Sequence, residues 1–230
     1  MWNLLAEKQG GKTLKYTEIR NHEEIRALLK KGNANLGVLG FTDHSTAHCA
    51  LVAERAADIL KALGYDEHTI ELSKIAGFMH DIGNAINRSH HAEYGGILAY
   101  QILKETDMPL EDRLTVVSAI GNHDEKDGVA LDPVTAAVII ADKTDVRRSR
   151  VVSPMEEFDI HDRVNYAVID ADVEVNKEEK TIILKLVVDE EICTMYEYFE
   201  IFLGRMKMSK NAAAVFGAKF ELIVNGRKVL

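Results

Sequence analysis

Histidine and acidic residues gather in one half of this 230-residue chain. Seven of the nine histidines lie between residues 44 and 123. Four imidazoles and two carboxylates fall on separate predicted helices, apart from one adjacent pair: His48, His80, Asp81, His91, His123 and Asp142. Imidazole nitrogen and carboxylate oxygen together suit divalent Mn, Fe, Zn, Ni or Mg better than copper in a sulfur site. These residue types therefore predict a metal centre.

The number of candidate ligands indicates how many metals such a centre would hold. Six ligands exceed the demand of one four-coordinate ion. Two ions that share the Asp81 carboxylate as a bridge would use all six, and a water between them could lose its proton near neutral pH. That hydroxide would be placed in line with a phosphorus atom. The set therefore predicts hydrolysis of a phosphate ester or anhydride, with His80 and Asp81 as catalytic residues.

The motifs around these residues resemble the HD-domain metal-dependent phosphohydrolase superfamily. The matching segments are HCALVAERA, GFMHDIG, HAEYGG, AIGNHDEKDG and IIADKTDVRRSR, which cover roughly residues 40 to 150. The resemblance implies a basic single-metal set of His48, His80, Asp81 and Asp142. His91 and His123 match the histidines that accompany two-metal members. It thus implies two divalent ions and a phosphorylated small molecule, most simply a nucleotide or dinucleotide, as the substrate.

Several neighbouring polar residues compete for roles at this centre. His44 lies one helical turn before the first candidate ligand, so it could join the ligands, cap the helix or support a ligand from outside. His90 competes with His91, which we prefer because HAEYGG has the HxxxGG spacing of the family. Asp124 and Glu125 could orient a ligand or act as a general acid, or they could form only an exposed acidic turn.

The densest basic cluster of the chain follows the last candidate ligand. Lys143, Arg147 and Arg148 are the predicted substrate-binding residues, because ammonium and guanidinium groups match phosphate oxygens, and Lys143 is also a catalytic candidate. On one continuous helix, only Asp142, Asp145 and Lys143 would lie towards the site. For the arginines, a solvated helix end with cations at its negative pole is the alternative.

Hydrophobic spacing and capping residues predict the helices that carry these groups. A first helix is predicted near 21–31, with a capping box of Asn21 and Glu24 and an end at Gly32. The next helices are predicted from Ser45 to Gly64 and from Asp66 to the His-Asp pair, and then over 89–106, 109–120 and 133–149. The His-Asp pair is therefore expected at a helix end.

The pattern changes from about residue 164. VNYAVIDADVEV and TIILKLVVD predict a β-hairpin, residues 191–208 a helix and KFELIV a last strand. The predicted fold class is mainly α, an all-helical HD-type bundle followed by a small α+β domain of ββαβ type. We expect an N-terminal helical segment at 1–35, the HD domain at 36–150, a linker at 151–163 and the C-terminal domain, of open role, at 164–230.

Composition and charge restrict the classes of function. With 47% hydrophobic and 28% charged residues, the chain should fold and bury a core. The net charge of −9 disfavours broad nucleic-acid binding. No apolar run reaches the ~20 residues of a membrane span, and the first residues lack a basic leader, so we expect a cytoplasmic protein without a membrane partner. Cys49 and Cys193 are expected as reduced thiols, and a homodimer is compatible with the chain.

Two other functions use the same residue types. A regulatory HD module would sense a nucleotide through its metal without catalysis, although loss of a ligand would be its usual sign and all six are present. A diiron HD oxygenase has the same kinds of ligand. The cyclic-dinucleotide phosphodiesterase branch, with its HHExxDGxGYP motif, is disfavoured because Asn122, Val129 and Ala130 replace its His, Tyr and Pro.

Overall fold

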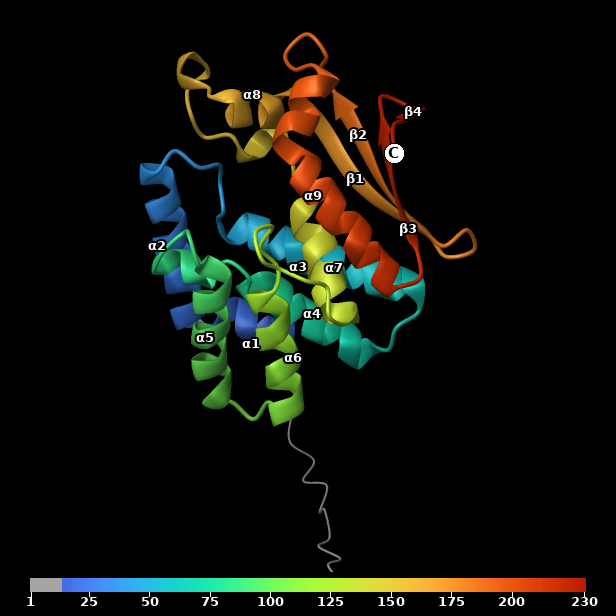
Figure 1. Cartoon of the computed structure of the whole chain (residues 1–230). Helices are drawn as coiled ribbons and strands as arrows, with labels where there is room; N and C mark the ends of the chain where they lie inside the picture. Colours follow the sequence, from blue (N-terminus) through green and yellow to red (C-terminus); the bar gives the residue numbers. More distant parts are fainter. Residues whose placement is uncertain (1–13) are drawn as a thin grey trace, which may run out of the picture.

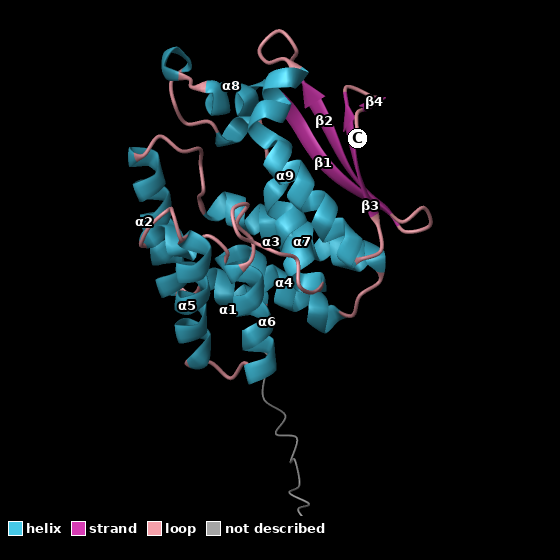
Figure 2. Cartoon of the chain, in the orientation of Figure 1, coloured by secondary structure: helices cyan, strands magenta, loops and turns pink. Residues whose placement is uncertain are grey.

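Helices form the first two thirds of the described chain. The computed structural model describes residues 14–230, and Figures 1 and 2 show a helical bundle beside a sheet covered by one long helix. The bundle comprises α1 (Tyr16–Asn21), α2 (Glu23–Val38), α3 (Thr46–Leu63), α4 (Glu67–Met79), the short 3-10 helix η1 (Ile82–Ala85), α5 (His91–Lys104), α6 (Leu110–Gly121) and α7 (Pro133–Lys143).

Local capping interactions set the starts of three of these helices where the sequence predicts them. The Ser45 hydroxyl accepts a hydrogen bond from the backbone N–H of the second residue of α3. Asp66 and Asp132 cap α4 and α7 through their carboxylates. Gly64 ends α3 at φ +86°, a backbone conformation that favours glycine. The His-Asp pair directly follows α4, as predicted.

The N-terminal helices differ from the prediction. Asn21 is the last residue of α1 and its amide donates to Thr17 O, so the predicted capping box with Glu24 is wrong. Gly32 lies inside α2, which continues to Val38. A Cβ at Gly32 would lie 3.0 Å from Asn84 Cβ, so this glycine permits close packing of α2 on η1 and does not end the helix. Part of the predicted 1–35 segment, residues 1–13, lies outside the described residues.

The helix that carries Asp142 is shorter than predicted. α7 ends at Lys143, and residues 148–150 form a separate 3-10 turn. Arg150 Nη1 donates to Asp145 O at 2.8 Å, and Thr144 Oγ1 donates to Ile140 O at 2.6 Å. These bonds satisfy carbonyl groups at the helix end without another helical turn.

The C-terminal region confirms the predicted mainly α class with an α+β end. It comprises α8 (Ile160–Ala167), β1 (Val168–Asn176), β2 (Thr181–Val188), α9 (Met195–Val215), β3 (Lys219–Val224) and β4 (Arg227–Lys228). The strand order is β1-β2-β3-β4; β2 pairs antiparallel with β1 and parallel with β3, and α9 makes the crossover. The prediction of a strand from residue 164 is wrong at its start, since residues 164–167 form the last part of α8 and β1 begins at Val168. Asp159 caps this helix through its carboxylate. β4 has only two residues, too few for a sequence pattern to indicate.

α7 lies between two clusters of buried apolar side chains. Val134 and Val138 face the helical bundle, whereas Ile139 and Ile140 pack with residues of the sheet and α9. A helix that is apolar on all sides belongs in a protein interior. α7 therefore holds Asp142 at a fixed place between the bundle and the sheet. Among residues 14–230, no helix combines the length and apolar character that a bilayer span requires.

We expect Gly83→Ala to destabilise the protein by about 2–3 kcal/mol, because a Cβ would overlap His91 O and lie 2.5 Å from Gly95 N. This contact holds η1 against α5. Chemical denaturation of the purified variant measures the change. Gly37→Ala is the control, since a Cβ there meets nothing within 4 Å, and it should raise helix stability by about 0.5 kcal/mol. Equal stability of Gly83→Ala and parent would contradict the packing argument.

Candidate metal centre

The ends of five helices converge on one buried cluster. The first turn of α3 supplies His48, the end of α4 supplies His80 and Asp81, and the start of α5 supplies His91. His123 follows α6, and Asp142 lies in the last turn of α7. The structure thus brings together all six side chains that the sequence selects. Five are buried, and the Asp142 side chain is 13% exposed.

The six side chains divide into two groups of potential ligands. His48, His80 and Asp142 form the first group, and Asp81, His91 and His123 form the second. Within each group, the potential ligand atoms lie within 4.8 Å of one another. Asp81 turns Oδ2 to His80 Nε2 at 3.3 Å and Oδ1 to His91 Nε2 at 3.7 Å. One carboxylate therefore faces both groups, which is the arrangement of a bridging ligand.

Each of the four histidines has its Nδ1 atom held by an oxygen. His48 Nδ1 lies 2.6 Å from Asp145 Oδ2. For the other three, the partner is a backbone carbonyl three residues earlier, at 2.6 to 3.0 Å: Gly77 O for His80, Arg88 O for His91 and Ile120 O for His123. An oxygen partner requires a proton on Nδ1 and leaves the Nε2 lone pair free. This arrangement is typical of metal-ligating histidines.

Three of the inward-facing atoms are buried and have no hydrogen-bond partner among residues 14–230. They are His48 Nε2, His80 Nε2 and Asp81 Oδ2. An unpaired buried polar atom costs roughly 1–3 kcal/mol, and each such atom in a folded protein needs an explanation. Lone pairs on imidazole nitrogen and carboxylate oxygen that converge on one place fit a divalent cation. The residues present thus fit the metals that the sequence predicts.

The charges of the cluster support this reading. Burial would lower the pKa of His80, but the Asp81 and Asp142 carboxylates outweigh it and raise the pKa to about 10. Burial and positive neighbours lower the pKa values of His91 and His123, so these imidazoles are neutral. Without a metal, a proton on His80 offsets part of the negative charge of the two carboxylates. A divalent ion would replace that proton, since metal binding requires the neutral imidazole.

Asp145 lies towards the centre, as the sequence predicts, and supports a candidate ligand from behind. Its fully buried carboxylate holds His48 Nδ1 and accepts two hydrogen bonds from Arg147, at 2.6 and 3.2 Å. Burial would raise its pKa, but His48 and the neighbouring arginines bring it well below the usual value. Asp145 therefore lies behind a candidate ligand as a permanent anion. Asn84 has a similar place, because its amide donates to Asp81 Oδ1 at 2.7 Å.

The three predicted substrate-binding cations have different surroundings. Lys143 is buried, with Nζ 2.7 Å from Asp142 Oδ2 at the edge of the cluster. Arg147 is held by Asp145, so its fork is already engaged. Arg148 stacks 4.5 Å above the Tyr166 ring and donates to that residue's backbone oxygen. The structure therefore brings Lys143 to the centre but not Arg148, because α7 ends before the arginines.

The other polar residues that the sequence offers for roles at the centre lie at its edge or outside it. His44 is outside both ligand groups, with Nδ1 2.6 Å from Thr42 O and its ring centroid 5.5 Å from that of His48. His90 is exposed beside Glu93. Asp124 Oδ1 lies 3.9 Å from His91 Nε2, at the limit of an ion pair, whereas Glu125 pairs with Arg205 on α9.

Cys49 is a neighbour of the cluster that the sequence did not indicate. Its Sγ lies within 4.8 Å of potential ligand atoms of His80 and Asp81. Burial, followed by the Asp81 and Asp142 charges, raises the pKa of its thiol well above the ordinary value. A protonated thiol is a poor ligand. Both cysteines are free, as predicted.

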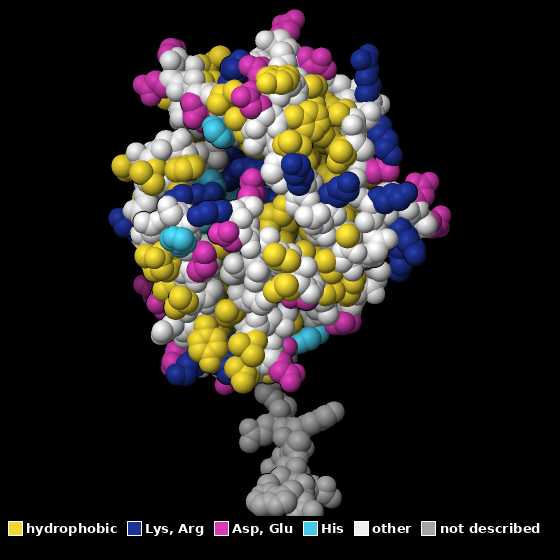
Figure 3. Space-filling view, in the orientation of Figure 1, with side chains coloured by type: hydrophobic (Ala, Val, Ile, Leu, Met, Phe, Trp, Pro, Cys, Tyr) yellow, Lys and Arg dark blue, Asp and Glu magenta, His cyan; other side chains and the backbone are white. Residues whose placement is uncertain are grey.

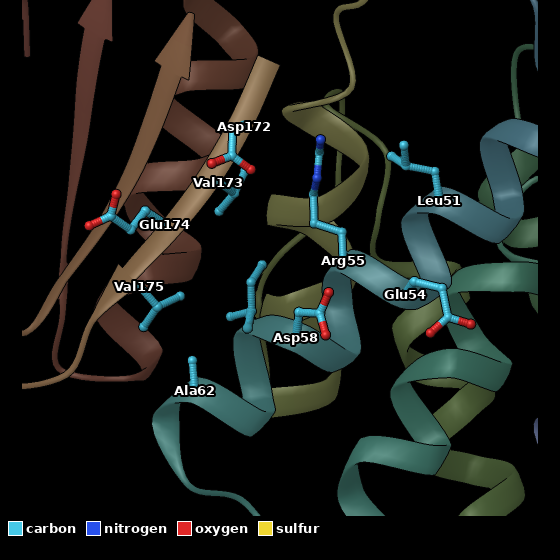
Figure 4. A pocket seen from close by; sticks show the side chains of 10 residues that line it. Leu51, Glu54, Arg55, Asp58, Ala62, Asp172, Val173, Glu174 and Val175 are labelled. Atoms are coloured by element: carbon cyan, nitrogen blue, oxygen red, sulfur yellow. The ribbon is translucent and has the colours of Figure 1, made fainter. Parts of the chain in front are cut away.

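Two hollows of the molecule differ in their charge. Figure 3 shows a depression between the α2–α3 link and α9, with histidine and basic side chains inside. A separate cavity of about 530 Å³ lies between α3 and β1, and Figure 4 shows its lining, which includes Arg55 and the carboxylates of Glu54, Asp58, Asp172 and Glu174. Arg55 donates to Thr144 Oγ1 and Ala171 O. The acidic lining of the second cavity is unfavourable for a phosphate.

Comparisons with known proteins agree with the sequence motifs. Residues 46–147, which include all six candidate ligands, match the family model of the HD domain. The uncharacterized protein MJ1020 of Methanocaldococcus jannaschii is 28% identical over 240 residues, which cover 92% of this chain and 91% of that protein. The predicted resemblance to the HD superfamily is thus confirmed.

A solved structure is also similar. It is a crystal structure of a predicted HD superfamily hydrolase from an uncultured Thermotogales bacterium, with 21% identity and a TM-score of 0.43. The match covers 58% of this chain and 75% of that chain. A likeness this low carries no conclusion about substrate or activity.

We expect Asp145→Asn to weaken metal binding by about 10- to 100-fold, because the neutral amide no longer fixes the His48 tautomer as firmly. Calorimetric titration with Mn²⁺ measures the affinity, and circular dichroism checks the fold. Asp58→Asn, an exposed change on the same helix as His48, is the matched control and should bind as the parent does. Parent-like affinity of Asp145→Asn would show that this support is unimportant.

Proposed function

We propose, from the premise that residues 46–147 form an HD domain, that this protein is a metal-dependent phosphohydrolase. It would cleave a phosphate ester or anhydride, and the motif resemblance favours a nucleotide or dinucleotide. The proposed ligands of two divalent ions are His48, His80, Asp81, His91, His123 and Asp142. The observation that carries the proposal is the Asp81 carboxylate, which faces two separate groups of buried imidazole nitrogens.

The chain's own residues would prepare the centre for this reaction. Divalent ions bound there would attract phosphate oxygens and lower the pKa of water. Asp81 would fix the spacing of the two ligand groups, since one rigid carboxylate reaches both. The carbonyl and Asp145 contacts at Nδ1 keep each imidazole in place, so little reorganisation would be needed during the reaction. Lys143 would contact a phosphate oxygen from the side of Asp142.

The net charge also bears on the substrate. A chain with a net charge of −9 repels anions at long range. A phosphorylated substrate must therefore be attracted by local positive charge, which two metals and Lys143 would supply. The basic side chains in the depression of Figure 3 support the proposal that the substrate enters there.

A phosphate-release assay tests the proposal. The purified protein, with Mn, Fe, Ni, Mg or Zn added, is offered a panel of mono-, di- and cyclic nucleotides, and elemental analysis gives its metal content. We expect about two ions per chain and release of phosphate or nucleotide from at least one compound. Metal-dependent nucleotide binding without cleavage would favour a sensor instead, and substrate-dependent consumption of O₂ would favour an oxygenase.

We expect Asp81→Ala to reduce turnover to background while the helical fold persists, because the substitution removes the shared ligand of both groups. Steady-state kinetics on the best substrate of the panel and circular dichroism are the two measurements. Turnover within a few-fold of the parent would place the chemistry elsewhere.

His123→Ala tests whether the centre uses two metals. If His91 and His123 hold a second ion, the variant should keep about half of the parent's metal and lose most activity. Elemental analysis and the release assay measure both quantities. Unchanged metal content and unchanged rate would favour a single ion held by His48, His80, Asp81 and Asp142.

A further inference from the structure

Arg88 places a positive charge beside the second ligand group. It lies in the segment that joins η1 to α5, between Asp81 and His91 in sequence. Its Nη1 lies 3.2 Å from His91 Nε2 and 3.4 Å from Asn84 Oδ1. Within residues 14–230, the Arg88 guanidinium pairs with no carboxylate. Its charge is therefore not neutralised by a described side chain.

The other cations near the centre are already paired. Asp145 accepts hydrogen bonds from Arg147 and lies 3.8 Å from Arg150. Lys143 lies against Asp142. Among these cations, Arg88 is therefore the one that can bind an external anion without first breaking an ion pair.

An aromatic ring holds the outer side of this guanidinium. The Arg88 guanidinium carbon lies 5.4 Å from the centre of the Phe41 ring, within the range of a cation–π contact. Phe41 lies in the α2–α3 link and is 41% exposed, and its backbone N–H donates to Leu36 O. Arg88 therefore reaches from an exposed ring at the surface to the buried His91.

Metal binding would change what Arg88 can contact. The His91 Nε2 lone pair cannot serve a metal and accept from Arg88 together. With that nitrogen committed to a metal, the Nη1 hydrogens would keep only the Asn84 oxygen. A guanidinium fork matches two oxygens of one phosphate. An anion bound next to the metals is the natural partner for the freed N–H groups.

We propose that Arg88 binds the leaving phosphate of a phosphoric anhydride substrate, with Phe41 as its positioning residue. This inference rests on the proposed function and narrows it to anhydrides. Lys143 lies beside the first ligand group and is paired with Asp142, whereas Arg88 lies beside the second group without a carboxylate partner among residues 14–230. The leaving group of a monoester offers one oxygen, which a single proton neutralises, whereas a leaving phosphate offers several charged oxygens that a guanidinium fork can hold. An anhydride places negative charge on its leaving phosphate in the transition state.

The reaction balances without another reactant. The oxygen of water forms a new bond to the scissile phosphorus as the bridging P–O bond breaks. The electron pair of that bond leaves on the bridging oxygen of the second phosphate, next to Arg88. The two protons of water pass to the products or to solvent.

A matched pair of substrates and a matched control variant test this assignment. Metal-loaded parent, Arg88→Met and Arg88→Lys are compared on a nucleoside diphosphate and on the monophosphate of the same nucleoside. We expect Arg88→Met to lower kcat/KM at least about ten-fold more for the diphosphate, and Arg88→Lys to recover part of that loss. Arg113→Met is the control, since Arg113 also stacks on a ring, Tyr100, but near the far end of α6.

The positioning role of Phe41 has its own readout. Phe41→Leu removes the ring but keeps an apolar side chain, so it should raise KM for the diphosphate several-fold and change kcat little. KM for the monophosphate should stay within two-fold of the parent. Equal changes for both substrates would show that Phe41 only stabilises the fold.

Binding of inorganic anions separates this inference from the proposed function. Calorimetry on the metal-loaded protein should show that Arg88→Met weakens the binding of pyrophosphate more than the binding of orthophosphate, with metal content unchanged. Equal losses for both anions, or loss of metal, would overturn the role of Arg88. A parent that binds pyrophosphate through Arg88 but cleaves nothing would overturn the phosphohydrolase proposal and retain the anion site.

Discussion

The structure depends on bringing two carboxylates and four imidazoles together at one point that is largely buried. Removing ionised groups from water costs several kcal/mol for each ion unless opposite charge or hydrogen bonds replace the solvent. Asp81 illustrates the balance: Asn84 satisfies Oδ1, whereas Oδ2 is buried without a hydrogen-bond partner. The surrounding helices must therefore hold these groups rigidly in place. A divalent cation at the centre would offset the desolvation cost that the protein's own groups leave uncompensated.

Helix ends provide the rigid contacts. The last carbonyls of an α-helix have no partner within the helix. His80 and His123 follow the ends of α4 and α6, and their Nδ1 atoms bond to Gly77 O and Ile120 O. One interaction thus satisfies an otherwise unpaired carbonyl and turns Nε2 toward the centre. This explains why these two candidate ligands follow the C-terminal ends of their helices.

The sequence predicts what is local and misses what depends on distant contacts. Ser45 and Asp66 predict the starts of their helices, because a cap needs only a hydrogen bond to a backbone N–H of the first turn. Gly32 suggests a helix end, but a glycine is needed there because η1, some fifty residues later in the chain, packs closely against α2. The six candidate ligands follow from their residue types and motif spacing. The spacing from Asp142 also places Asp145 towards the centre, but its contact with His48 depends on the fold. Arg88 has no comparable signal, because its role depends on which side chains the fold brings beside it.

The C-terminal region contributes to the centre through packing, since its described residues supply none of the six ligands. α7 is buried between the bundle and the sheet, so the sheet and α9 hold the helix that carries Asp142. α9 also reaches the loop after His123: Arg205 pairs with Glu125, and a Cβ at Gly128 would lie 2.7 Å from Met208 Cε. Two candidate ligands from opposite ligand groups are thus backed by one element. The position of α9 therefore bears on the spacing between the two groups, the quantity on which bridging by Asp81 depends.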